Sequence, residues 1–310
     1  AMRKNENEAL LYETLFSLAK KDEKKAFLMY NMVALKADIT RTLPEIISQI
    51  TDVTGFNSYE ISETYYRLRN AFSAYHFDYT IISELDDIWP KSLKGSDIHF
   101  LYLVGKKELL TTNKVAIRGF RSPSEDGKNN AISAVREIEA ADATLVTTLD
   151  VGLDHYCASY ALSQGLPIIL ILSSPLHVAV PESGKELMVN VANTNGLLVS
   201  QFPPSAKVEK WYAVPRNRLL VSLCDHFLIC EEKDGGPLFN QAESFLEQKG
   251  RVLAYETFVT NPIYTYAQKL SQQVGVTILK RKGDLKKAIT PPKKKERKKK
   301  DDEQLELFDL

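Results

Sequence analysis

The sequence predicts an α/β protein that is built on a mostly parallel, doubly wound sheet of the Rossmann-like kind. Two observations predict it. From residue 100 onward, short and uniformly apolar runs recur, and polar segments of helix length separate them. Apolar runs of this kind are typical of strands that are buried on both faces of a parallel sheet. The chain has 310 residues, which is long enough for about two domains.

Residues 1–88 predict a small all-helical domain in front of the sheet. Apolar side chains recur there with the three-to-four-residue spacing of a helix, in three groups followed by a tyrosine-rich segment at 59–72. No residue in this part has the spacing of a catalytic site. Docking, dimerisation and contact with a DNA backbone all remain open as roles for it.

We expect residues 89–279 to form the sheet domain. We expect strands at 100–104, 115–118, 144–148, 167–172, 196–200, 226–230, 252–255 and 276–279. We expect helices at 127–141, 153–163, 181–193, 216–223, 239–248 and 261–273. In such a sheet the ligand lies beyond the carboxyl ends of the strands, near the N-termini of the helices.

The loops after the strands are therefore where a binding site is expected, and three of them carry glycine at 119–123, 150–152 and 231–237. Glycine allows a backbone to approach a ligand closely. The chain contains neither G-x-G-x-x-G nor the Walker pattern GxxxxGK[ST], so we expect no dinucleotide or nucleoside triphosphate site of the standard type, and no cofactor.

The segment around Pro215, Arg216, Asn217 and Arg218 places two guanidinium groups beside an amide after a proline-marked loop. Guanidinium groups suit bidentate contacts to phosphate oxygens better than lysines do. The spacing is equally typical of a solvated or salt-bridged helix face, so both interpretations stand.

The net charge of zero hides a strongly basic tail. Residues 280–300 contain 12 Lys and Arg against 2 Asp and Glu. We expect residues 280–310 to be a disordered, Lys-rich tail, which serves either to contact nucleic acid or only to keep the protein soluble.

Catalysis, metal binding and membrane insertion find little support. No window reaches the ~20 apolar residues of a membrane span, and the first residues lack the apolar core of a signal peptide. We therefore expect a cytoplasmic protein whose three cysteines are buried free thiols. Neither the histidines nor the cysteines have a metal-ligand spacing. Asp150, Asp154 and His155 fall in one post-strand loop, but with no nucleophile placed nearby they predict capping or hydrogen bonding and no catalytic residue.

Several segments, in order along residues 85–260, resemble the DNA-processing protein A family, which is also called Smf. The matching segments are WPKSL and FLYLVG at 89–105, VAIRGFR at 115–121, LVSQFPP at 198–204, VPRNRLL at 214–220, and GGPL through QKGRV at 235–252. They are similar to the family patterns Y-P-x-x-L with a strand ending in Gly, V-A-I-V-G-S-R, L-L-S-E-Y-P-P, F-P-x-R-N-R-I-I and S-G-S-L…E-Q-G-R-x-V. Among them, VPRNRLL is the most specific match.

Two departures mark a divergent member. Phe120 stands where the family pattern G-S-R has a small residue. The family's G-L-A-R-G-I-D loop reads TLDVGLD at 148–154, so that Val151 replaces its arginine and a nearby family histidine falls on Ala158.

The resemblance implies a Rossmann-like domain that binds single-stranded DNA, helps to load the RecA recombinase, and acts as a homodimer without chemistry of its own. Phe120 is then expected to stack on a base or to pack against the sheet, with equal weight. The residues expected at the DNA are Gly119, Phe120, Arg121, Gly152, Lys210, Arg216, Asn217, Arg218, Gly235 and Gly236.

The end of the tail resembles a peptide through which bacterial polymerases and repair proteins hold the DNA sliding clamp. Its residues Gln304, Leu305, Leu307 and Phe308 match the pattern Q-L-(S/D)-L-F. A few apolar anchors on a tether bind a groove at modest affinity. Docking of this end on the protein's own body is the alternative.

Two other functions remain open. The first is a nucleotide-binding or nucleotide-cleaving enzyme that resembles the phosphoribohydrolases, although their P-G-G-x-G-T-x-x-E motif is only partly matched at 234–238 and Glu243. The second is a scaffold that recruits partners to the sliding clamp without an activity of its own.

Overall fold

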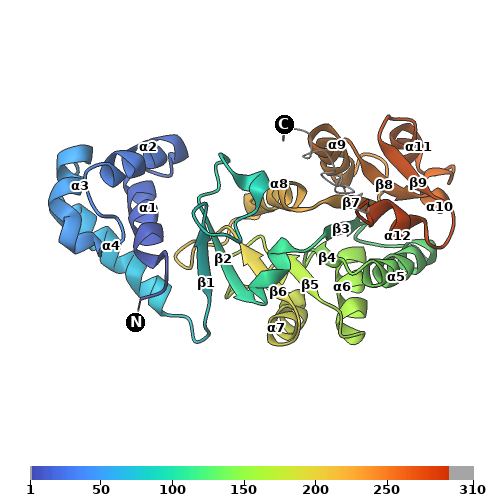
Figure 1. Ribbon diagram of the computed structural model, residues 1–310, viewed down its shortest axis with the longest axis horizontal. Coiled ribbons are helices and arrows are strands. Elements are labelled where there is room, and N and C mark those ends of the chain that lie inside the picture. Colours follow the sequence, from blue (N-terminus) through green and yellow to red (C-terminus); the bar gives the residue numbers. More distant parts are fainter. Residues whose placement is uncertain (1, 293–310) are drawn as a thin grey trace, which may run out of the picture.

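The computed structural model describes residues 2–292 and contains one nine-stranded sheet (Figure 1). The strands are β1 (Thr80–Ser83), β2 (Phe100–Gly105), β3 (Lys114–Gly119), β4 (Thr144–Thr147), β5 (Ile168–Ile171), β6 (Leu197–Ser200), β7 (His226–Glu231), β8 (Val252–Tyr255) and β9 (Val276–Leu279). Their order across the sheet is β1-β2-β6-β5-β4-β3-β7-β8-β9. The strands from β6 to β9 pair in parallel, whereas β2 runs antiparallel to both β1 and β6. The α/β, mostly parallel prediction is thus confirmed.

Helices cover both faces of the sheet. One face packs against α5 (Glu125–Ala140), α6 (Leu153–Ser163) and α7 (Lys185–Asn193), and the other against α8 (Ala213–Leu223) and α9 (Leu238–Lys249) (Figure 1). Because neighbouring residues of a strand point to opposite faces, the strands feed two separate cores. Along β3, for example, Val115 and Ile117 lie in the first core and Ala116 in the second.

The N-terminal helices form a layer beyond the antiparallel edge of the sheet (Figure 1). They are α1 (Glu6–Leu18), α2 (Glu23–Ala34), α3 (Ile47–Thr54) and α4 (Ser58–Ser73), with a short 3-10 helix η1 (Leu43–Ile46) between α2 and α3. Their apolar side chains join the first core, where Phe72 of α4 meets the ring of Tyr102 of β2 edge to face. The helical layer and the sheet therefore share one core.

The strand β1 is an element that the sequence did not predict. It lies at residues 80–83, within the segment that was assigned to the helical domain. All eight predicted strands are present. The four residues of β1 directly follow the apolar pattern of the preceding helices, outside the alternation of strands and helices that begins at residue 100, so no local change of spacing marks it.

The order in which the chain adds parallel strands to the sheet reverses at β3. The chain runs outward through β4, β5 and β6 on one side of β3, and through β7, β8 and β9 on the other. The boundary between β3 and β7 is therefore a topological switch point, beyond whose carboxyl ends a doubly wound sheet binds its ligand.

Of the last described elements, two helices pack at the β8–β9 edge of the sheet and the third packs against α5. In order, these helices are α10 (Glu256–Val259), α11 (Thr265–Ser271) and α12 (Asp284–Ile289). The side-chain amide of Asn113, the residue before β3, donates a hydrogen bond to the carbonyl oxygen of Ile289 at 2.7 Å. Among the residues from 2 to 292, no helix combines the length and the apolar character that a membrane crossing needs.

Candidate nucleic-acid interface

The loops that carry the predicted site residues meet at the switch point. Gly119 ends β3, Asp150 follows β4, and the segment 231–237 follows β7. The N-terminal part of α8, which holds Arg216, packs beside them: its guanidinium group donates to both carboxylate oxygens of Asp150, at 2.9 and 3.2 Å. Four segments that lie far apart in the sequence are thus joined at one place.

The centre of this place is a buried polar network around Arg118, a residue that the sequence analysis did not single out. Its guanidinium group is 3 % exposed and donates hydrogen bonds to two carboxylates, Asp154 at 2.7 Å and Asp150 at 2.9 Å. It also donates to the side-chain oxygens of Gln241 at 2.7 Å and Asn217 at 3.1 Å. A buried guanidinium is tolerated when its donors are satisfied in this way.

Arg216 belongs to the same network and not to the surface. It is 2 % exposed, and its Nε atom donates to the oxygen of Asn217 at 2.7 Å. Burial opposes ionisation of Asp150, but the charges of Arg216 and Arg118 outweigh it and hold the pKa of Asp150 below its usual value. Two arginines and two aspartates make the network formally neutral, so the guanidinium of Arg216 is already matched before any phosphate arrives.

Two of the predicted glycines are required by packing within the protein. A Cβ atom on Gly119 would lie 2.2 Å from the side chain of Leu153, and one on Gly152 would lie 2.3 Å from the carbonyl oxygen of Arg121. Gly152 also has a φ of 93°, which favours glycine. The amide of Gly119 donates to Asp154 at 2.9 Å. These glycines therefore hold the β3 and β4 loops against each other.

The loop after β7 has one open side. Gly235 has a φ of 76°, is exposed, and has no atom within 4 Å of the place where a Cβ would stand. Gly236 is buried against the carboxylate of Glu232, which accepts hydrogen bonds from the amides of Lys233 and Leu238 at 2.9 and 3.2 Å. Of these two predicted glycines, Gly235 is the one whose backbone faces solvent.

Exposed basic side chains lie on or next to the segments that form the buried network. Arg121, Lys210 and Arg218 are all exposed. Lys210 lies in the short 3-10 helix η5 (Lys210–Tyr212) that leads into α8. The ammonium group of Lys233 lies 5.9 Å from the centre of the half-buried ring of Phe120. Arg121, Lys210 and Arg218 are together called the basic rim below.

The other candidate residues named in the sequence analysis lie on the surface, are half-buried, or lie outside the described residues. His155 is half-buried, and its Nδ1 atom lies 3.3 Å from the hydroxyl of Ser159. Glu243 is exposed on α9. Within residues 2–292 no three His, Cys, Asp or Glu side chains gather as a metal site would require. Gln304, Leu305, Leu307 and Phe308 lie outside the described residues.

A signal for the missed network does exist in the sequence. Arg118 is the charged residue in the run VAIRG of β3, and the other residues of this run are apolar or glycine. An arginine in such a strand has to find carboxylate partners, because an unpaired buried charge is costly. Asp150 and Asp154 follow the neighbouring strand and meet this need.

The sheet domain is similar in sequence to known proteins. A family model described as DNA recombination-mediator protein A matches residues 80–289. The chain is 27% identical over 194 residues to DNA processing protein DprA of Streptococcus pneumoniae, which covers 61% of this chain and 67% of that protein. It is 26% identical over 220 residues to DNA processing protein DprA of Bacillus subtilis, which covers 69% of this chain and 73% of that protein.

Two solved structures share the fold. The structure of DprA from Streptococcus pneumoniae has a TM-score of 0.63 at 23% identity and covers 81% of this chain and 89% of its own. A structure of DNA processing protein A from Helicobacter pylori, described as giving insight into the single-stranded DNA binding mode of that protein, has a TM-score of 0.57 at 21% identity. It covers 69% of this chain and 95% of its own.

Proposed function

Because the chain belongs to the DNA recombination-mediator protein A family, we propose that it binds single-stranded DNA along the basic rim and acts as an accessory factor in DNA recombination, uptake, repair or defence. The observation that carries the proposal is the position of Arg121, Lys210 and Arg218. All three are exposed: Arg121 follows Gly119 by two residues, Arg218 follows Arg216 by two, and Lys210 lies just before α8, so each is on a segment that contributes to the switch point, where this fold binds its ligands. The Helicobacter pylori relative is itself described as binding single-stranded DNA.

The two arginines of the Arg-Asn-Arg segment have different roles in this proposal. Residues two apart on a helix point about 200° from each other, so Arg216 faces the network while Arg218 faces solvent. Arg218 neutralises a phosphate. Arg216 is a positioning residue that holds α8 against the β4 loop through Asp150.

Phe120 supplies a surface for a base. Its ring is half-buried and borders Lys233, so one part packs on the protein and another part remains open. Stacking of a base on an aromatic ring contributes about 1–3 kcal/mol and depends little on the base. The combination of charged and aromatic side chains is typical of proteins that bind single strands without sequence preference.

Salt-titrated binding of a fluorescent single-stranded oligonucleotide tests the proposal. Replacing Arg121, Lys210 and Arg218 by alanine together should weaken binding and reduce the slope of log K against log salt by about 2, since each lost phosphate contact removes about 0.7. Arg136→Ala is the matched control, because Arg136 is exposed near the far end of α5. An unchanged slope in the triple variant would show that DNA binds elsewhere.

We further propose a homodimer, RecA as a partner, and attachment to the sliding clamp through Gln304, Leu305, Leu307 and Phe308, all without catalysis. Removal of residues 304–310 should abolish clamp binding in a pull-down and leave the salt slope for DNA unchanged. Retained clamp binding would exclude the peptide. Release of a free base from a nucleoside monophosphate, lost in Glu243→Ala, would instead support the enzymatic alternative.

A further inference from the structure

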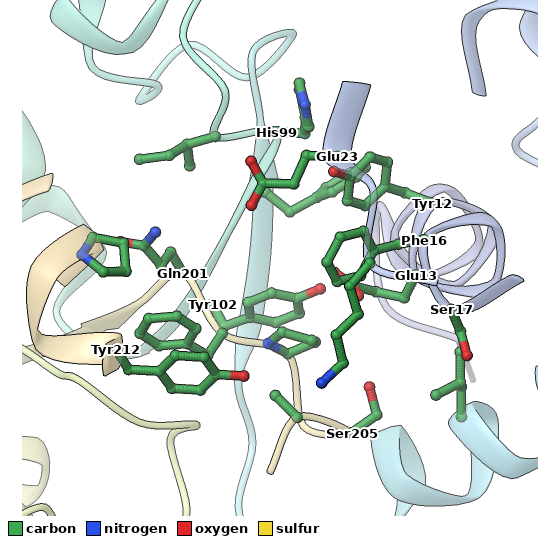
Figure 2. Close-up of a pocket in the computed structure, with 18 of the residues that line it drawn as sticks. Tyr12, Glu13, Phe16, Ser17, Glu23, His99, Tyr102, Gln201, Ser205 and Tyr212 are labelled. Atoms are coloured by element: carbon green, nitrogen blue, oxygen red, sulfur yellow. The ribbon is translucent and has the colours of Figure 1, made fainter. Parts of the chain in front are cut away.

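A cavity of about 580 Å³ lies between the helical layer and the sheet, and none of the charged residues of the buried network lines it. Helix α1 forms one wall, β2 forms another, and the segment from residue 201 to 215 forms the third (Figure 2). The volume lies within the range of about 300–1,000 Å³ that small-molecule sites occupy. We call it the interdomain cavity.

The walls of the interdomain cavity are rich in flat aromatic side chains. The rings of Phe202 and Tyr212 stack at 3.8 Å between centres, with an angle of 8° between their planes. On the opposite wall, the rings of Tyr12 and Phe16 are parallel within 8°. A cavity with stacked aromatic pairs on two walls suits a flat ring that packs face to face or in an offset manner.

Two buried polar atoms in the cavity wall lack a partner. The hydroxyl of Tyr102, a residue that is 1 % exposed, and the side-chain oxygen of Gln201 have no hydrogen-bond partner among the described residues. In Figure 2 the hydroxyl groups of Tyr102 and Tyr212 point toward the α1 side of the cavity. A buried polar atom without a partner costs free energy, and a ligand with its own polar edge would satisfy it.

A carboxyl group completes the polar edge of the cavity. Burial raises the pKa of Glu13 to about 8, and the nearby carboxylate of Glu23 adds to the effect. A neutral carboxyl group both donates and accepts a hydrogen bond. The edge of a nucleobase offers the same mixture of donors and acceptors in one plane.

The exposed side of the cavity, which we call its mouth, carries basic side chains. Lys20, Lys21, Arg67 and Lys207 line it and are exposed. Lys20 and Lys21 are consecutive residues with φ values of 54° and 64°. Such left-handed conformations are uncommon for residues other than glycine and gather at ligand sites. Glu23 and Asp97 line the cavity too and are exposed. A phosphate would be attracted to the four basic side chains and repelled by these two carboxylates.

From this arrangement we propose that the interdomain cavity binds a purine nucleotide, with the base between the aromatic walls and the phosphate at the lysines of the mouth. Glu13 and Tyr102 contact the polar edge of the base. The site goes beyond the proposed function and uses none of the residues of the basic rim. Since Pro215 and Trp211 line the cavity and Lys210 and Arg218 adjoin them, the base comes either from a free nucleotide or from a bound strand.

Calorimetric titration of the full chain with AMP and with GMP tests the site. We expect saturable binding of at least one of them, at least about tenfold weaker in Glu13→Ala, since a hydrogen bond to a group of this kind contributes that much. Glu13→Gln keeps one donor and one acceptor and should stay within a few-fold of the wild type. Tyr102→Phe should weaken binding while the Glu60→Ala control, an exposed residue of α4, leaves it unchanged.

The two sources separate by oligonucleotides. If the base comes from a strand, a purine oligonucleotide should bind more tightly than a pyrimidine one, and Glu13→Ala should remove the difference. Absence of saturable binding by AMP and GMP together with equal oligonucleotide affinities would overturn the proposal. So would nucleotide binding that is identical in Glu13→Ala, or saturation by spermidine with no nucleotide binding. Loss of DNA binding in the basic-rim triple variant bears on the proposed function alone.

Discussion

Replacement of Arg216 by methionine should destabilise the protein through the buried network rather than through a lost phosphate contact. Methionine keeps much of the side-chain volume but removes the guanidinium group, which donates to Asp150 twice and to Asn217 once at 2.7 to 3.2 Å. Removing one partner of a buried ion pair costs about 3–5 kcal/mol, because the remaining charge stays buried.

The structure places the expected loss at the lower end of this range. Asp150 keeps the guanidinium of Arg118 at 2.9 Å, so its charge remains partly compensated. A loss of about 3 kcal/mol corresponds to a decrease in Tm of about 6–12 °C for a domain of this size.

Urea unfolding at equilibrium measures the effect, with Arg218→Met as the exposed control, which should change the free energy of unfolding by about 0.5 kcal/mol or less. Adding Asp150→Asn to Arg216→Met should restore part of the loss, because it removes the uncompensated carboxylate. If Arg216→Met unfolds within about 1 kcal/mol of the wild type, the network does not hold the site together in the way described.

Three further predictions concern other parts of the molecule. Gly152→Ala should lower the free energy of unfolding in urea more than Gly235→Ala. Both positions have a positive φ, which costs alanine about 1–3 kcal/mol, but only at Gly152 would the added Cβ also clash with the backbone. Equal losses in the two variants would contradict this. The folded-state pKa of Glu13, about 8, exceeds its ordinary value of 4.5, so its contribution is fully present below about pH 4.5 and is lost as pH rises toward 8. Relative to Glu13→Gln, the wild type should therefore lose up to about 1.4 kcal/mol per pH unit in this window, by urea unfolding at several pH values; parallel curves would refute it. Burial raises the pKa of all three cysteine thiols, so a thiol reagent should label them in urea and not in the native protein; rapid native labelling would contradict the burial of Cys157, Cys224 and Cys230.

The sheet could be predicted from the sequence because its signal is local. A strand that is buried on both faces consists of apolar residues whatever surrounds it, and each of the eight predicted runs is a strand of the sheet. The strand β1 was missed because it directly follows the helical segments and stands outside the alternation of strands and helices that begins at residue 100, whereas β9, which is as short and also at an edge, belongs to that alternation. The place of β1 depends on pairing with a partner twenty residues later, which no local pattern reports.

The meeting of the candidate site's segments was predictable, but the orientation of their side chains was not. The glycine loops and the Arg-Asn-Arg segment do gather at the switch point, as the order of strands and helices implies. Which of Arg216 and Arg218 faces inward depends on how α8 is rotated against the sheet. That rotation is fixed by Asp150, which lies 66 residues away, so sequence spacing alone leaves both orientations open.

The interdomain cavity gave no signal in the sequence. Its walls come from α1 and from residues about 190 positions later, and each segment by itself has the pattern of an ordinary core element. Tyr12 and Phe16 have helical spacing, and their ring faces are indistinguishable from core packing until the opposite wall is in place.

The position of α12 next to the start of β3 relates the end of the described chain to the candidate site. The bond between Asn113 and Ile289 fixes the last described helix at the amino end of β3, whereas the Arg118 network lies at its carboxyl end. The six residues of β3 separate these poles by about 20 Å. The last described helix and the buried Arg118 network therefore lie at opposite ends of the same strand.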